Sequence, residues 1–106
     1  MFASKIAAAA RQTGAEVVFA RSSDEVLRQA RALRPRLVIF DLNGHRTEPL
    51  ATLSALKADP ELQGLRTLGF VSHVQADLIE RARQAGIDEV LARSAFSARL
   101  GEILRP

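Results

Sequence analysis

Three polar residues each follow an apolar run: Asp41 after LVIF, Ser72 after GFV and Arg93 after EVLA. A carboxylate can be a nucleophile or an anionic anchor, and a hydroxyl can hydrogen-bond a phosphoryl oxygen. A guanidinium offers a planar fork to a carboxylate or a phosphate. The alternative is structural: Asp41 and Arg93 pair to hold two loops together, and Ser72 caps the next helix.

The surrounding segments decide whether these side chains can meet. Apolar and β-branched runs predict strands at 16–20, 36–42, 66–72 and 87–93, and helices are predicted at 4–14, 22–33, 49 to about 59, 73–86 and 94–104. Strands that alternate with helices predict a parallel sheet with helices on both faces. Because reactive groups gather outside the carboxyl ends of such strands, Asp41, Ser72 and Arg93 are expected at one edge.

Local signals mark the ends of these elements. Ser22 and Glu25 are spaced as a capping box, and Pro49 suits a first helical turn. Ser4, Ser94 and Ser97 are candidate helix caps, Gly14 and Gly86 are candidate helix stops, and Gly69 should weaken its strand.

Composition bounds the function. The 106 residues are 47% hydrophobic and 25% charged, as expected for one globular domain. Cysteine is absent, which excludes disulfides and thiolate metal sites. No signal peptide and no apolar run of ~20 residues is seen, so we expect a cytoplasmic protein without a membrane partner. No catalytic triad or glycine-rich phosphate loop appears, so we expect no enzyme.

Basic residues leave a nucleic-acid partner open. The net charge is +3, and Arg28, Arg31 and Arg34 recur every third residue before Arg36. They could contact phosphates, but a solvated helix face is the favoured interpretation. His45 and His73 flank the candidate site; exposed loop histidines are favoured over metal ligands, and no metal is expected there.

With these elements in place, the chain resembles the receiver domain of bacterial response regulators, the CheY-like, flavodoxin-like fold, as a single domain over 1–106. The resemblance is carried by LVIFDLN, GFVSHV and AGIDEVLARSAF. It implies that Asp41 stands at the phospho-acceptor position, Ser72 at the Ser/Thr switch position and Arg93 in place of the usual Lys. The backbone carbonyl of Asn43 would help to hold Mg²⁺, and Phe96 matches the Phe after that Lys.

Several residues depart from the receiver pattern. The expected first strand with its acidic pair is missing, since no acidic residue precedes Glu16. Mg²⁺ is therefore expected only if such a pair is supplied, and no other cofactor is expected. Ser94 replaces a Pro, and Val90 stands where the aromatic switch residue would be, so the usual Thr–Tyr coupling is absent.

The missing strand has a consequence for assembly. It would be central in the strand order 2-1-3-4-5, so either the chain start omits a real strand or the sheet is rearranged. Pairing of 16–20 directly with 36–42 could close the gap within one chain. Because unpaired strand edges recruit other chains, we expect a homodimer.

Three functions follow, in order of preference. The first is a stand-alone, atypical (pseudo-)receiver in bacterial two-component signalling or a phosphorelay, with impaired or lost phosphorylation of Asp41. It would act through protein contacts with a histidine kinase or downstream regulator, using a surface at about 75–104. The second is a genuine phospho-accepting receiver truncated at its N-terminus. The third is a basic α/β nucleic-acid-binding module.

Overall fold

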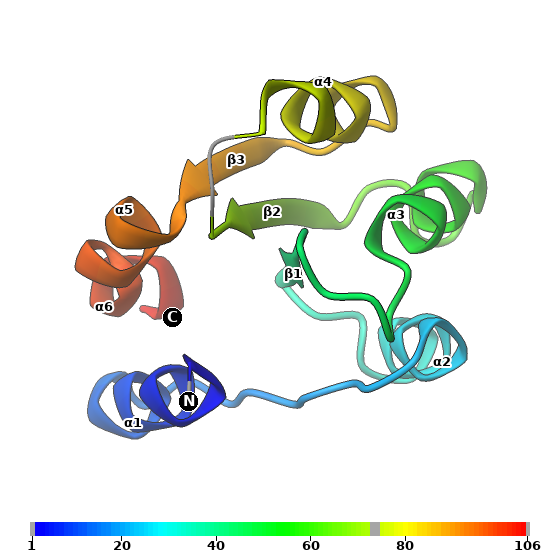
Figure 1. Cartoon of the computed structure of the whole chain (residues 1–106). Coiled ribbons are helices and arrows are strands. Elements are labelled where there is room, and N and C mark those ends of the chain that lie inside the picture. Colours follow the sequence, from blue (N-terminus) through cyan, green and yellow to red (C-terminus); the bar gives the residue numbers. More distant parts are fainter. Residues whose placement is uncertain (1, 73–74, 106) are drawn as a thin grey trace. The chain divides into compact units, whose positions relative to one another are not determined.

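A computed structural model describes residues 2–72 and 75–105 of the chain. This part contains nine helices and strands (Figure 1). In order they are α1 (Phe2–Thr13), α2 (Ser23–Leu33), β1 (Leu37–Asp41), α3 (Pro49–Ala58), β2 (Arg66–Val71), α4 (Ala76–Gln84), β3 (Glu89–Ala92), α5 (Arg93–Ala98) and α6 (Leu100–Leu104). They form two compact units, residues 20–93 and residues 1–19 with 94–106. The single domain expected over 1–106 stays a prediction.

The larger unit contains a parallel sheet in the order β1-β2-β3. Asp41 is in register with Phe70, and Val71 is in register with Ala92. The middle strand is buried from Thr67 to Val71, as expected for a strand with neighbours on both sides. The predicted parallel sheet flanked by helices is confirmed.

The strand predicted at 16–20 is wrong. In the described part of the chain this segment is extended but belongs to no sheet, and its pairing with β1 is not found. Val18 and Phe19 are 56% and 47% exposed. A β-branched, aromatic composition favours a strand only where a neighbouring strand supplies a ladder and a surface to pack on. Among the residues that the structure describes, β1 pairs with β2 alone, and it is half-buried from Leu37 to Ile39.

Most of the predicted helix ends are confirmed. The Ser22 hydroxyl accepts a hydrogen bond from the Glu25 N–H at 3.1 Å, and Pro49 opens α3. Gly14 and Gly86 follow α1 and α4 with positive φ values of 77° and 101°.

Three predicted caps are wrong. Ser4 lies inside α1, which begins at Phe2. Ser94 and Ser97 also lie inside a helix, because the expected C-terminal helix is divided into α5 and α6 with Arg99 as the cap between them. Regular hydrophobic spacing does not reveal such a division.

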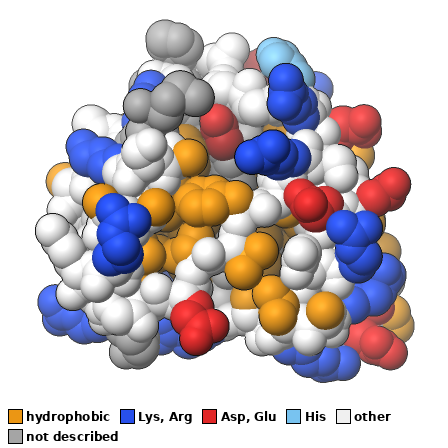
Figure 2. Space-filling model, turned by 90° about the horizontal axis from the view of Figure 1, so that it is seen from below, with side chains coloured by type: hydrophobic (Ala, Val, Ile, Leu, Met, Phe, Trp, Pro, Cys, Tyr) orange, Lys and Arg blue, Asp and Glu red, His pale blue; other side chains and the backbone are white. Residues whose placement is uncertain are grey.

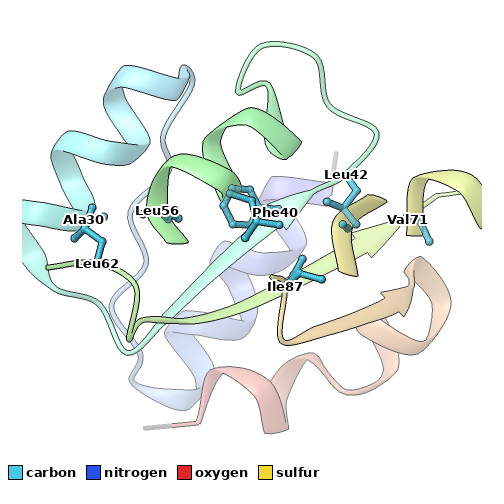
Figure 3. Close-up of a cluster of buried hydrophobic side chains, with 9 residues drawn as sticks. Ala30, Phe40, Leu42, Leu56, Leu62, Val71 and Ile87 are labelled. Carbon is cyan, nitrogen blue, oxygen red and sulfur yellow. The ribbon is translucent and has the colours of Figure 1, made fainter. Parts of the chain in front are cut away.

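The core of the larger unit joins its helices to the sheet. Figure 3 shows Ala30 from α2, Leu56 from α3, Phe40 from β1 and Val71 from β2 in one cluster. Polar contacts add to this packing: the hydroxyls of Thr52 and Ser23 are 2.8 Å apart. In the smaller unit, α1 packs on α6, with Ile6, Ala10, Leu100 and Leu104 buried.

Gly69 is required by close packing in the middle of β2. A Cβ atom on Gly69 would lie 2.7 Å from Leu42 Cδ1 and 2.8 Å from Ile87 Cδ1. Both side chains belong to the core cluster and have little room to move. Glycine therefore allows two large side chains to lie directly against the strand, which compensates for its poor strand propensity.

We predict that Gly69→Ala lowers the free energy of unfolding by about 1–3 kcal/mol, because the new methyl group overpacks the core. The measurement is urea unfolding followed by circular dichroism. Gly101→Ala is the matched control: nothing lies within 4 Å of its Cβ position in α6, so it should be neutral or stabilising. Equal stability of Gly69→Ala and the unmodified protein would refute the packing argument.

A polar cluster joins the amino ends of β2 and β3. The Asp88 carboxylate accepts hydrogen bonds from the N–H of Thr67 at 2.8 Å and from its hydroxyl at 2.9 Å, and Lys57 Nζ lies 3.4 Å away. The Thr67 N–H is the largest cause that holds the pKa of Asp88 below its ordinary value, and burial acts in the opposite direction. The charged form of Asp88 is therefore favoured by folding.

We predict that Asp88 contributes to acid sensitivity. Its pKa is lower in the folded than in the unfolded chain, so its contribution is complete above the unfolded pKa and is lost as the pH falls through the folded value. Asp88→Asn should reduce stability at neutral pH and flatten the fall in stability from about pH 5 to pH 2. Urea unfolding at several pH values measures both effects. Parallel pH curves for the two proteins would contradict this assignment.

Candidate functional site at the carboxyl edge of the sheet

The carboxyl edge brings the three predicted residues to neighbouring strand ends. Asp41 is the last residue of β1, Ser72 follows β2 and Arg93 follows β3 as the first residue of α5. All three are exposed. Adjacent strands are ~4.8 Å apart, so β1 and β3 are separated by about two such spacings. An ion pair between Asp41 and Arg93 stays a prediction.

Asp41 is held by a tight local turn. Its Oδ1 atom accepts a hydrogen bond from the Asn43 N–H at 3.0 Å, and its carbonyl accepts one from the Gly44 N–H at 3.0 Å. The bonds fix the carboxylate at the rim of the sheet, where water solvates it. An acid at the end of an apolar strand therefore avoids the cost of burial.

The Asn43 side chain connects this turn to the loop after β2. Its Oδ1 atom accepts a hydrogen bond from the Ser72 N–H at 2.7 Å, and its Nδ2 atom donates one to Gln75 Oε1 at 2.8 Å. Only the Asn43 backbone carbonyl was predicted from the sequence to take part in the site, and the role of its side-chain amide was not. The sequence does show two polar residues, Asn43 just after Asp41 and Gln75 just before α4. Their hydrogen bond could not be predicted, because it depends on the register of the sheet.

The remaining predicted positions have different environments. Gln75, and not Ser72, is the N-terminal cap residue of α4, so the capping role considered for Ser72 is wrong. Phe96 is fully buried in α5, and Val90 packs against the core. His45 is exposed, whereas His73 lies outside the described residues.

The oxygen atoms at this edge make an incomplete metal site. Within 2–72 and 75–105, no three His, Asp or Glu side chains gather where they could hold a metal ion. The Asp41 carboxylate and the predicted Asn43 carbonyl are oxygen ligands of the kind that Mg²⁺ accepts, but its octahedral shell needs more of them. These residues alone do not fit the ion.

The arginines in α2 and at its C-terminal cap lie near carboxylates. Arg31 lies 2.8 Å from Asp59, and Arg28 and Arg34 each lie 3.9 Å from a glutamate, Glu25 and Glu61 respectively. The Glu61 N–H and then the Arg31 guanidinium hold the pKa of Asp59 below its ordinary value. Figure 2 shows basic and acidic side chains interspersed on the face it draws. The positive charge of Arg28, Arg31 and Arg34 is therefore partly neutralised.

Comparison with known proteins identifies the fold of the chain. No family model and no curated protein matches the chain. Among solved structures, the phosphorylated cyanobacterial phytochrome response regulator RcpA is 27% identical with a TM-score of 0.69, over 85% of this chain and 69% of that one. The receiver domain of NtrX from Brucella abortus is 23% identical with a TM-score of 0.76, over 92% and 82% of the two chains.

A third structure agrees with these two. A response regulator in red light signalling of R. palustris is 19% identical, with a TM-score of 0.79 over 98% of this chain and 81% of that one. The chain therefore has the CheY-like fold of response regulator receiver domains, and the resemblance seen in the sequence is confirmed. No helix in the described residues has the length and apolar character needed to span a membrane.

Proposed function

We propose that this chain is an atypical receiver module that acts in signal transduction through protein contacts and not as an enzyme. The observation that carries the proposal is the placement of Asp41, Ser72 and Arg93 at successive strand ends of a receiver fold. A histidine kinase or a downstream regulator is the proposed partner class. Binding would involve the part of 75–104 that includes α4 and β3.

We propose further that residues 1–106 accept a phosphoryl group at Asp41 poorly. Phosphoryl transfer depends on neutralising charge around the reacting oxygens. The described oxygens at the edge do not fit Mg²⁺, and Arg93 presents a broad guanidinium where a compact ammonium is usual. A working phospho-receiver is the second candidate, because Asp41 and Ser72 are both exposed at this edge.

Nucleic-acid binding is not favoured. Phosphate contacts need cations whose charge is available to the ligand. Arg28, Arg31 and Arg34 already face carboxylates at 2.8–3.9 Å. The aromatic side chains on which single-stranded bases stack are also scarce, since the chain has five Phe and no Trp or Tyr.

We predict little phosphorylation when the chain is incubated with acetyl phosphate and Mg²⁺, because the described residues at this edge do not hold the ion that phosphoryl transfer needs. Intact-mass spectrometry measures the added phosphoryl group, and Asp41→Asn is the matched control. Stoichiometric addition to the unmodified chain that disappears in Asp41→Asn would establish the working phospho-receiver instead.

The proposed assembly is a homodimer formed through the outer edge of β1. In the described residues β1 pairs only with β2, so its other side carries unpaired backbone groups. The segment from Leu37 to Phe40 contains no charge or proline, the usual protections of an open edge. An open edge with unpaired N–H and C=O groups is a template for another strand, which favours pairing with a second copy.

We predict a dimer at tens of micromolar in sedimentation equilibrium. Leu37→Lys places a charge on the open edge and should shift the protein towards monomer. Leu33→Lys is the matched control, because Leu33 is 54% exposed at the end of α2, outside the sheet. A folded monomer over the whole concentration range would contradict the proposed assembly.

A further inference from the structure

Residues 16–20 form an extended segment that has the composition of a strand and no strand beside it. Within the described part of the chain, the backbone of this segment makes no hydrogen bond. Val18 and Phe19 are both exposed, although β-branched and aromatic side chains favour a sheet in which neighbours cover them. The segment therefore offers a row of N–H and C=O groups, together with apolar side chains, to an open strand edge.

The outer edge of β1 matches this segment in length and in charge. Each stretch has four apolar residues between two charged residues of opposite sign, EVVFAR at 16–21 and RLVIFD at 36–41. Parallel pairing in register places Glu16 opposite Arg36. At the other end it places Arg21 opposite Asp41, and all four side chains are exposed. An antiparallel arrangement would instead oppose the two acids and the two bases, and like charges directly opposite each other destabilise a sheet.

The apolar residues between these charges also suit the parallel alignment. It places Val18 opposite Val38 and Phe19 opposite Ile39. Pairs of β-branched residues, and of an aromatic with a β-branched residue, are among the cross-strand pairs that stabilise sheets. Val38 and Ile39 are only half-buried in β1, so the described residues of one copy do not cover them completely.

We propose that residues 16–20 of one copy add as a parallel strand to the outer edge of β1 in a second copy, in the register that places Val18 opposite Val38. Within the described residues of one chain the two stretches are not paired, so the edge comes from another copy. Reciprocal exchange closes a dimer, because each copy supplies one segment and one edge. The inference rests on the homodimer proposed above and names the segment that fills its edge.

Disulfide trapping tests this pairing directly, because the chain contains no cysteine. Val18→Cys is mixed with isotope-labelled Val38→Cys in a glutathione redox buffer, and intact-mass spectrometry measures the mixed disulfide-linked dimer. Opposite residues on adjacent strands lie ~4.8 Å apart, within the reach of a disulfide. We expect about tenfold more mixed dimer than with Leu33→Cys as the partner, because pairing raises the effective concentration of the two thiols. Leu33 is as exposed as Val18 but lies outside the sheet.

The possible results separate this inference from the proposed assembly. Equal amounts of mixed dimer with the two partners would overturn the exchange of residues 16–20. Antiparallel pairing of two β1 strands with their charged ends matched would bring Val38 opposite Ile39. Val38→Cys would then cross-link with Ile39→Cys and not with Val18→Cys, which would overturn the exchange and leave the homodimer standing. A monomer in sedimentation equilibrium would contradict both.

A charge-reversal cycle tests the register. Glu16→Lys places two cations opposite each other and should raise the dimer dissociation constant about tenfold, since a reciprocal dimer contains the contact twice. Adding Arg36→Glu to the same chain reverses the pair and should restore the original constant. Glu80→Lys makes the same change of charge at an exposed site in α4 and should leave the constant unchanged. Failure of the second reversal to restore dimerisation would overturn the proposed register.

Discussion

The parallel ladder of β1, β2 and β3 is the constraint on which the site depends. Its register places Asp41 beside Phe70 and Val71 beside Ala92, so successive strands end at the same edge. Leu42 extends the ladder by one bond, from its N–H to the carbonyl of Phe70 at 3.0 Å. Asp41, Ser72 and Arg93 are separated by tens of positions in the sequence. They come to neighbouring strand ends only because these strands are parallel and in this register.

The ladder is maintained at both ends by different means. At the amino end, Asp88 accepts two hydrogen bonds from Thr67 and joins the starts of β2 and β3. In the middle, Gly69 lets Leu42 and Ile87 pack directly on the strand. At the carboxyl end the Asn43 amide joins the loops. Polar contacts at the strand ends therefore complement the buried core cluster between the helices and the sheet.

Much of this arrangement could be predicted from the sequence, because it depends on local pattern. The apolar run before Asp41, the capping residues Ser22 and Glu25, and the glycine stop at Gly86 each indicate their element without tertiary information. The alternation of helices and strands then predicts the sheet, and the sheet predicts the shared edge.

The parts that could not be predicted depend on contacts between distant residues. Residues 16–20 have strand composition but no partner strand in the described chain, so propensity alone is misleading there. The division between α5 and α6 at Arg99 leaves no mark in the periodicity. The bonds from Asn43 to Ser72 and Gln75 span 29 and 32 positions and appear only once the register is known.

The parallel register of β1, β2 and β3 brings Asp41 to the same edge of the sheet as the ends of its neighbouring strands. The most direct measurement is an NMR experiment that detects scalar couplings across hydrogen bonds in the labelled protein. We expect a coupling from the Leu42 amide nitrogen to the Phe70 carbonyl, together with close proton contacts between the Asn43 side-chain amide and the Ser72 N–H. A coupling from Leu42 to a different carbonyl would show that the strands pair in another register. The strand ends would then not meet as described.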